Sequence, residues 1–425
     1  MQRAKKPTVI HVVPKMGAGG GPAGYAYRLK QILESNNCDE YNIFFYESSC
    51  AKGVYEYAMN RHLWRFEEIA EGRISHGKFI SRSASAVITS HKRFRSRQQS
   101  EYDLLAKTLN YYVNSCPPPD PNLSIFADAD LIIFHATLTA SSFIRKSKFR
   151  TQRIVIMPHS PTPTTAEIAE AIRPSVDPYI LVNDPVFKGM LEEERRIYSL
   201  ADYLVAPCDS ALDTYRAMSS KWSKVVDSSR VVKCITGTPP PAVKAGRKEW
   251  RKRLNVDDTQ ILAVYIGRYH PHKGYDLLEP AVNLVRQNLS VDLVLACAGG
   301  QSDSGNDVVR HVGFTEDPGG LMAAADLVIF PNRHAYFDLG VLECFSLGTP
   351  IVMTDVGGHQ DLARMAPGIH AVKPTSESIA SGITEIVKQL NFGVLNQGTK
   401  VAYEKFFTPR AFAMNHYQLY KELLA

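Results

Sequence analysis

Residues 261–274 read Ile-Leu-Ala-Val-Tyr-Ile-Gly-Arg-Tyr-His-Pro-His-Lys-Gly, an unbroken apolar run followed by a loop with an arginine and a lysine. Such a run, bounded by turn residues, is typical of a parallel strand that is buried on both faces. In open α/β sheets, the loop after the carboxyl end of a strand is where ligands bind. The stretch therefore predicts an α/β fold with two cations at its binding edge.

Similar apolar runs recur along the chain and alternate with longer segments of helical spacing. This alternation is the pattern of parallel βαβ units, so we expect two doubly wound α/β domains. Three consecutive prolines, residues 239–241, followed by the charged segment Lys244–Lys252, predict a linker between the domains. The predicted buried strands are Thr8–Val13, Asn42–Tyr46, Asp130–Phe134, Ile154–Met157, Tyr203–Ala206, Ile261–Ile266, Leu293–Ala298, Leu327–Phe330 and Pro350–Thr354.

Composition excludes several classes of protein. The chain has 425 residues, 44% hydrophobic and 22% charged, which argues against collagen-like, coiled-coil and wholly disordered chains. A net charge of +6 is too small for the dense basic face of a nucleic-acid-binding protein. Seven scattered cysteines without a Cys-x-x-Cys pair predict neither disulfides nor zinc, and they favour a cytoplasmic protein. No apolar run is long enough to span a membrane, so we expect any membrane contact to be peripheral.

Three segments share one pattern in which an alanine and an aspartate precede a strand. They begin at Ala129, Ala201 and Ala325. Aspartate at such a position is a turn residue. We therefore interpret Asp128-Ala129-Asp130 as structural, and we expect no metal site.

The segment Arg61–Arg97 combines many basic residues with interleaved aromatic ones. One interpretation is a solvated charged helix pair. The other is peripheral docking to anionic headgroups at the inner face of a membrane. Both interpretations stay open from the sequence.

A glycine-rich turn at Gly17–Gly24 joins the first strand to a segment with helical spacing. Backbone amides at such a helix start suit a phosphate. The turn also fits Gly-x-Gly-x-x-Gly, and Glu47 closes the next strand, so a dinucleotide-dependent oxidoreductase is one alternative. Another is that the glycines only let strand and helix pack closely.

Residues 331–350 and several shorter motifs resemble the retaining glycosyltransferases of family 4 (glycosyl transferases group 1), which have the two-domain GT-B fold. The resemblance is specific from Gly267 to Asp361, where it includes Gly267-Arg268, Lys273-Gly274, Leu342-Glu343 and Gly357-Gly358. It is looser in the first half. It implies Rossmann-like domains at residues 1–238, for the acceptor, and 239–405, for the donor, facing a central cleft. Residues 406–425 would form a helix crossing back to the first domain.

The resemblance implies roles for individual residues. Arg268 and Lys273 would bind the donor diphosphate, and Glu343 would hold the ribose. His159 would position the sugar and the acceptor, so the implied catalytic set is His159, Arg268, Lys273 and Glu343. The implied donor-binding residues are Gly17, Gly19, Gly20, Gly267, Arg268, Lys273, Val312, Phe337, Asp338, Leu339, Gly340 and Glu343, with His135 and Ser160 on the acceptor side.

The sequence departs from the family at Ala335, where a first glutamate usually contacts donor-sugar hydroxyls. Asp338 occupies a position that is usually glycine. The resemblance implies a retaining, metal-independent hexosyl- or deoxyhexosyltransferase without a cofactor, which uses a nucleotide-diphosphate sugar and a glycan, glycolipid or other hydroxyl acceptor. Ala335 keeps open a non-catalytic partner or sugar-binding subunit as the alternative.

Overall fold

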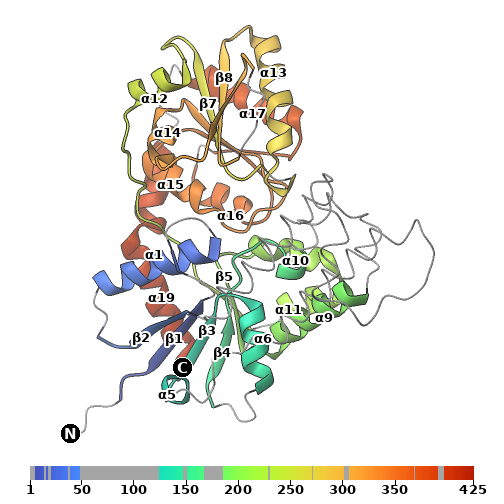
Figure 1. The fold of residues 1–425 in the computed structure, drawn as a ribbon, viewed down its shortest axis with the longest axis vertical. Helices are drawn as coiled ribbons and strands as arrows, with labels where there is room; N and C mark the ends of the chain where they lie inside the picture. The colour runs from blue at the N-terminus through green and yellow to red at the C-terminus, as the bar shows by residue number, and fades with distance from the viewer. Residues whose placement is uncertain are drawn as a thin grey trace, which may run out of the picture.

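The computed structural model contains two parallel six-stranded sheets, which Figure 1 shows one above the other. Residues 5–13, 16–17, 21–36, 39–47, 124–146, 151–166, 185–227, 230–269, 271–300, 306–367, 369–390 and 397–425 are described here. The first sheet has the order β2-β1-β3-β4-β5-β6 and the second β12-β11-β10-β7-β8-β9. The strands are β1 (Thr8–Val13), β2 (Asn42–Glu47), β3 (Leu131–Phe134), β4 (Arg153–Ile156), β5 (Tyr203–Ala206), β6 (Val231–Lys233), β7 (Ile261–Ile266), β8 (Leu293–Ala298), β9 (Val309–Gly313), β10 (Leu327–Phe330), β11 (Ile351–Thr354) and β12 (His370–Val372).

Alternate residues of the first sheet face two helical layers, as the period of a strand requires. Val9 and Leu131 pack with α1 (Gly21–Ser35) and α19 (Pro409–Leu424). Ile10 and Ile132 face the opposite layer. That layer contains α5 (Ser124–Ala127), α6 (Thr137–Lys146), α9 (Pro185–Leu200), α10 (Asp213–Met218) and α11 (Ser220–Val226).

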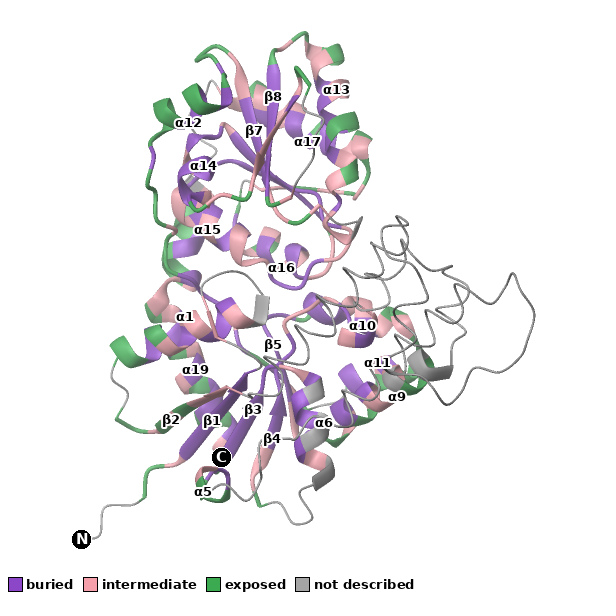
Figure 2. Cartoon of the chain, in the orientation of Figure 1, coloured by how far each residue is buried: buried purple, intermediate pink, exposed green. Residues whose placement is uncertain are grey.

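The second sheet is covered in the same way, and Figure 2 shows the buried strands between partly exposed helices. Ala263 and Leu295 face α13 (Leu278–Leu289) and α17 (Ser376–Gln389). Leu262 and Val294 face the other layer. That layer contains α12 (Arg247–Leu254), α14 (Pro318–Ala324), α15 (Leu339–Leu347) and α16 (Gly358–Met365), and α18 (Gln397–Ala402) follows in the chain.

The structural role predicted for the three aspartates is confirmed. Each donates its backbone amide to a carbonyl of the neighbouring strand, and its carboxylate accepts the amide of that same residue at 2.7–2.8 Å. The aspartates thus align the starts of adjacent strands. The pairs are Asp130 with Thr8, Asp202 with Ile154, and Asp326 with Leu262.

Two expectations about the elements are wrong. The strand predicted at Asn42–Tyr46 exists as β2 but is not buried, because it is an edge strand and Phe44 remains 44% exposed. The charged segment Lys244–Lys252 is not all linker, since α12 begins at Arg247 and buries Arg251 against Asp326.

Two crossings of the chain between the sheets lie against each other. Thr238 donates its amide to the Phe407 carbonyl at 2.9 Å, and the Tyr403 hydroxyl donates to the Thr238 carbonyl at 2.8 Å. At Gly237, a Cβ would come within 2.7 Å of the Phe412 Cβ, so the first crossing needs a glycine there. These contacts join the link between the sheets to the start of α19.

Candidate functional site

Loops at the carboxyl ends of the two sheets contact each other, and we call this region the junction. The Ser210 amide, beyond β5, donates to the Asp361 carboxylate of α16 at 3.1 Å. In each sheet the strand order reverses beside the first strand, between β1 and β3 and between β7 and β10. Such switch points are where open α/β sheets bind ligands. The residues that follow β1, β3, β7 and β10 are therefore the primary candidates.

Lys273, on the loop after β7, is held by Asp338. Its Nζ lies 3.1 and 3.2 Å from the two carboxylate oxygens. Asn332 donates to Asp338 Oδ2 at 2.7 Å, and His359 Nε2 lies 3.3 Å from the same oxygen. Burial alone would raise the pKa of Asp338, but the Lys273 ammonium and His359 hold it well below its usual range. Asp338 therefore remains ionised and fixes the lysine in place.

Asp338 stands at the N-cap of α15, yet its side chain makes no capping hydrogen bond. The first amides of a helix have no carbonyl partner within it. Because Asp338 turns its carboxylate to Lys273, the amides of Leu339 and Gly340 are left without that cap. This helix start can therefore receive an anion.

Glu343, in α15, pairs across the junction with Arg28 of α1. Arg28 Nη2 lies 2.7 Å from Glu343 Oε1, and the two side chains are only 21% and 14% exposed. Burial raises the pKa of Glu343, which the Arg28 charge opposes. Arg28 Nη1 is buried, and no described residue forms a hydrogen bond with it. The pair therefore has an unused donor beside the carboxylate.

The other donor-side candidates occupy different environments. Arg268 is exposed, and within the described chain no hydrogen bond to its guanidinium is present. Gly267 packs tightly, because a Cβ there would meet the Tyr265 hydroxyl at 2.8 Å. Val312, in β9, is partly buried. The Phe337 side chain is buried 6.1 Å from the Phe407 ring, so it belongs to the core.

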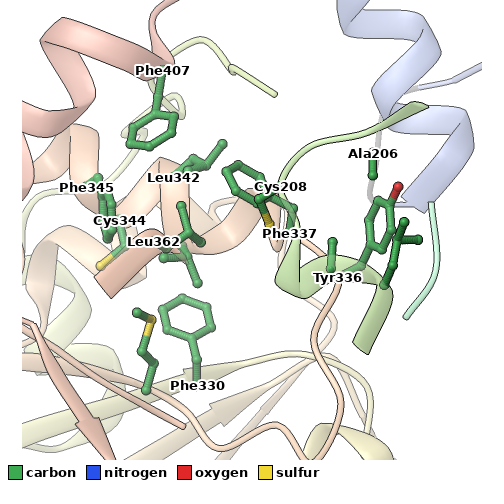
Figure 3. Packing of buried hydrophobic residues seen from close by; sticks show 14 of the residues in the cluster. Ala206, Cys208, Phe330, Tyr336, Phe337, Leu342, Cys344, Phe345, Leu362 and Phe407 are labelled. Carbon is green, nitrogen blue, oxygen red and sulfur yellow. The ribbon is translucent and has the colours of Figure 1, made fainter. Parts of the chain in front are cut away.

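Ala335 is 1% exposed, and the backbone around it is tightly packed. A Cβ on Gly357 would come within 2.0 Å of the Ala335 carbonyl oxygen, and one on Gly358 would collide with the Tyr336 carbonyl. The Tyr336 ring lies beside Ala206 of the first domain (Figure 3), and both belong with Cys208 to one buried cluster. Its hydroxyl is buried without a hydrogen-bond partner among the described residues. Tyr336 therefore brings an unsatisfied polar atom to the junction.

On the first-domain side, His135 follows β3 and His159 follows β4. His135 Nδ1 lies 2.7 Å from His159 Nε2, and the rings are nearly parallel. His135 is 2% exposed, whereas His159 is partly exposed. Burial lowers the pKa of His159 to about 3, with a smaller contribution from His416. The neighbouring Ser160 accepts the Tyr215 hydroxyl on its carbonyl at 3.3 Å.

The glycine-rich turn and the basic segment are described only in part or not at all. Gly17 is described, and no atom of the described residues lies within 4 Å of a hypothetical Cβ there. Gly19, Gly20 and the basic segment Arg61–Arg97 lie outside the described residues. Within the described ranges, no group of three or more metal-binding side chains is present, and no helix is long and apolar enough to cross a membrane.

The sequence interpretation missed several residues of the site. Arg28 could have been suspected only because it lies on the helix that follows the glycine-rich turn. His11 was visible as a polar interruption of an apolar strand. Asn332, Tyr336 and His359 gave no signal, because their importance arises from contacts between distant elements.

Comparison with known proteins assigns part of the chain to a family. Residues 246–392 match the family described as "Glycosyl transferases group 1". A D-inositol 3-phosphate glycosyltransferase of Salinispora arenicola is 33% identical over 129 residues, which are 25% of this chain and 29% of that protein. A GDP-mannose-dependent alpha-mannosyltransferase of Mycolicibacterium smegmatis is 30% identical over 177 residues, 40% and 43% of the two chains. The chain thus matches less than half the length of these relatives.

Solved structures extend the likeness to the whole fold. Sucrose-phosphate synthase from Thermosynechococcus elongatus aligns with a TM-score of 0.60 at 15% identity, over 98% of this chain and 99% of that one. The catalytic domain of starch synthase IV from Arabidopsis thaliana, bound to ADP and acarbose, has the same TM-score at 13% identity, over 99% and 100%. Residues 246–392 thus match the glycosyl transferases group 1 family, and they lie within a chain that has the two-domain α/β GT-B fold.

Proposed function

We propose that the protein is a retaining, metal-independent glycosyltransferase of family 4 that transfers a sugar from a nucleotide-diphosphate sugar to a hydroxyl acceptor. The observation that carries the proposal is the largely buried Glu343 carboxylate at the junction, beside Arg28 Nη1, which has no hydrogen-bond partner among the described residues. A buried carboxylate and an orphaned donor both require hydrogen-bond partners. A ribose diol supplies both, since its hydroxyls donate to Glu343 and its oxygens accept from Arg28.

Two cations on the loop after β7 suit the diphosphate, and one of them, Lys273, pairs with the N-cap residue of α15. Lys273 is held in place by Asp338, whereas Arg268 is exposed and its guanidinium donates no hydrogen bond to a described residue. Together with the amides of Leu339 and Gly340, they would stabilise the charge that develops on the leaving nucleotide. In a front-face retaining transfer the leaving phosphate takes the acceptor proton, so the protein mainly orients the reactants.

The donor sugar in this proposal is one that makes no hydrogen bond at Ala335. Asp338 could replace the missing glutamate only if its carboxylate were available, but Lys273, Asn332 and His359 already surround it. A sugar lacking one hydroxyl would leave no unpaired group at Ala335. A deoxyhexose is thus favoured over a replacement contact from Asp338.

The test measures the binding of UDP, GDP and ADP and of their sugar conjugates, together with the turnover of the conjugates. Glu343→Gln should weaken nucleotide binding about 10- to 150-fold, because a hydrogen bond to a charged group contributes about 1.5–3 kcal/mol. Glu385→Gln on α17, whose side chain pairs with Lys388, is the matched control and should bind normally. Unchanged affinity in Glu343→Gln would contradict the proposal.

A non-catalytic nucleotide-sugar-binding subunit is the second candidate, and the buried Ala335 favours it. This candidate predicts nucleotide binding that depends on Glu343 but no donor hydrolysis or transfer with any conjugate. Donor hydrolysis by the wild-type protein would exclude it.

A further inference from the structure

Three histidines from neighbouring strands form a continuous hydrogen-bonded chain that ends at His159. His11 lies within β1 and is 0% exposed. Its Nδ1 is 2.8 Å from His135 Nε2, and His135 Nδ1 is 2.7 Å from His159 Nε2. At the other end, His11 Nε2 lies 2.7 Å from the hydroxyl of Tyr420 in α19. We call these four residues the histidine chain.

The tautomers of the three histidine rings depend on one another, because each neutral ring has only one N–H to donate. Burial lowers the pKa of each ring, so all three are neutral at physiological pH and each carries one N–H. Every link needs one donor and one acceptor. If His11 donates from Nδ1, His135 must carry its proton on Nδ1 as well, and so must His159. In the opposite arrangement all three carry it on Nε2. The rings therefore change tautomer together.

Tyr420 selects between the two arrangements. A phenol hydroxyl is a better donor than a neutral imidazole N–H, and an imidazole nitrogen is a better acceptor than a phenol oxygen. Tyr420 therefore donates to His11 Nε2, which places the His11 proton on Nδ1. Each following ring of the histidine chain then also accepts on Nε2 and donates from Nδ1. His159 therefore carries its N–H on Nδ1, the ring nitrogen that makes no hydrogen bond within the histidine chain.

A second contact from α19 reaches the His159 ring through Tyr25 of α1. His416 Nδ1 lies 3.1 Å from the Phe412 carbonyl, which only accepts, so the proton is on Nδ1. His416 Nε2 then accepts the Tyr25 hydroxyl at 3.1 Å, because burial lowers the pKa of His416 to about 4 and keeps the ring neutral. The Tyr25 ring lies 4.3 Å from the His159 ring. α19 thus supports His159 from two sides.

We propose that His11, His135 and Tyr420 are positioning residues that hold His159 as its Nδ1–H tautomer, so that it donates a hydrogen bond to a hydroxyl or phosphate oxygen of the sugar nucleotide. The inference rests on the proposed function and on the role that the family resemblance implies for His159, which is to position the sugar and the acceptor. It goes further by making His159 a donor rather than a base, and by giving α19 a part in setting its tautomer.

Nitrogen NMR of the full-length protein, with 15N-labelled histidine, reads the tautomer without any substrate. The expected wild-type result is an Nδ1–H tautomer for His11, His135 and His159. Tyr420→Phe should fold, since it loses only a hydroxyl, but His159 should become a mixture of tautomers. Tyr417→Phe removes a hydroxyl from the same helix outside the histidine chain, and it should leave the His159 signals unchanged. An Nε2–H tautomer in the wild type, or no change in Tyr420→Phe, would overturn the proposal.

Kinetics supplies the second readout. Tyr420→Phe should lower kcat about fivefold, the weight of one neutral hydrogen bond, with little change in KM for the donor. His159→Asn keeps an N–H near the position of Nδ1 and should retain more activity than His159→Gln, whose N–H lies near the position of Nε2. Greater activity in His159→Gln would overturn the donor role. Absence of any turnover would contradict the proposed function instead, while the NMR result would still decide the tautomer.

Discussion

Where the two domains meet, the first contributes mainly neutral rings and the second mainly charges. His135 and His159 follow strands of the first sheet and are kept neutral by burial. Lys273 and Asp338 follow strands of the second sheet, and the Lys273 ammonium helps to hold the pKa of Asp338 well below its usual range. Charged groups suit an anionic nucleotide, whereas neutral donors suit sugar hydroxyls. Under the proposed function, the charged side would hold the nucleotide diphosphate and the neutral side the sugar.

Acid should affect the first domain before the second. A histidine whose folded pKa is lowered leaves the unfolded state binding more protons below about pH 6.5, so stability falls as the pH drops through that value. As the pH falls, each such histidine should lower the free energy of unfolding by up to about 1.4 kcal/mol per pH unit until its folded pKa is reached. The histidines concerned are His11, His135, His159 and His416. Asp338 has a lowered pKa too, but its contribution is lost only below about pH 4, the unfolded value.

Hydrogen exchange at pH 7 and pH 5 measures this difference. Amides of β1 and β3 should lose protection at pH 5 before those of β7 and β10. In denaturant unfolding, His11→Gln should flatten the pH dependence of stability, and His311→Gln in the second domain is the control. Equal loss of protection in both sheets would show that the first domain has no special acid sensitivity.

Removing Lys273 should destabilise the second domain as well as weaken nucleotide binding. Lys273→Met leaves the Asp338 carboxylate without its cation. Because the pair is only partly exposed, the free energy of unfolding should fall by about 2 kcal/mol. Adding Asp338→Asn should recover most of the unfolding free energy but none of the nucleotide affinity. If the double variant recovered both the unfolding free energy and the nucleotide affinity, Lys273 would affect nucleotide binding only by stabilising the domain.

The sequence was sufficient for the strands that helices cover on both faces, because these are apolar throughout. It failed at edge strands. β6, β9 and β12 were not predicted, and each is an edge strand that is not buried throughout. Such strands lack the continuous apolar pattern, since one side of the backbone has no neighbouring strand to cover it.

For the candidate site, the sequence suggested residues whose spacing within one loop or helix is informative, such as Arg268, Lys273 and Glu343, and their roles stay predictions. Their partners were missed because the contacts join distant parts of the chain. Arg28 and Glu343 are separated by 315 positions, and His11 and Tyr420 by 409. Which polar residue meets which depends on how α1 and α19 pack, and no local pattern contains that information.

Arg268 tests the charged side without disturbing the fold, because its side chain is exposed and has no hydrogen-bond partner within the described chain. Arg268→Ala should weaken nucleoside diphosphate binding by about 1.5 kcal/mol, roughly tenfold, with an unchanged melting temperature. Nucleoside affinity should not change, since only the phosphates are involved. Calorimetric titration with both ligands is the measurement, and Arg286→Ala on α13 is the control. An equal loss for nucleoside and nucleoside diphosphate would assign Arg268 to the base or the ribose instead.

Tyr336 is the residue that crosses the division between the two sides, because it follows β10 of the charged domain but packs beside Ala206 of the neutral one. Its hydroxyl is buried without a partner among the described residues, which in an unliganded protein costs stability. Tyr336→Phe should therefore leave the free energy of unfolding unchanged or raise it by up to about 1 kcal/mol. If a sugar or acceptor hydroxyl satisfies this group in the complex, the same variant should lower kcat/KM about fivefold. Unfolding and steady-state assays on one preparation measure both quantities. A loss of stability together with normal kcat/KM would mean that the hydroxyl has a structural partner and is not part of the binding site.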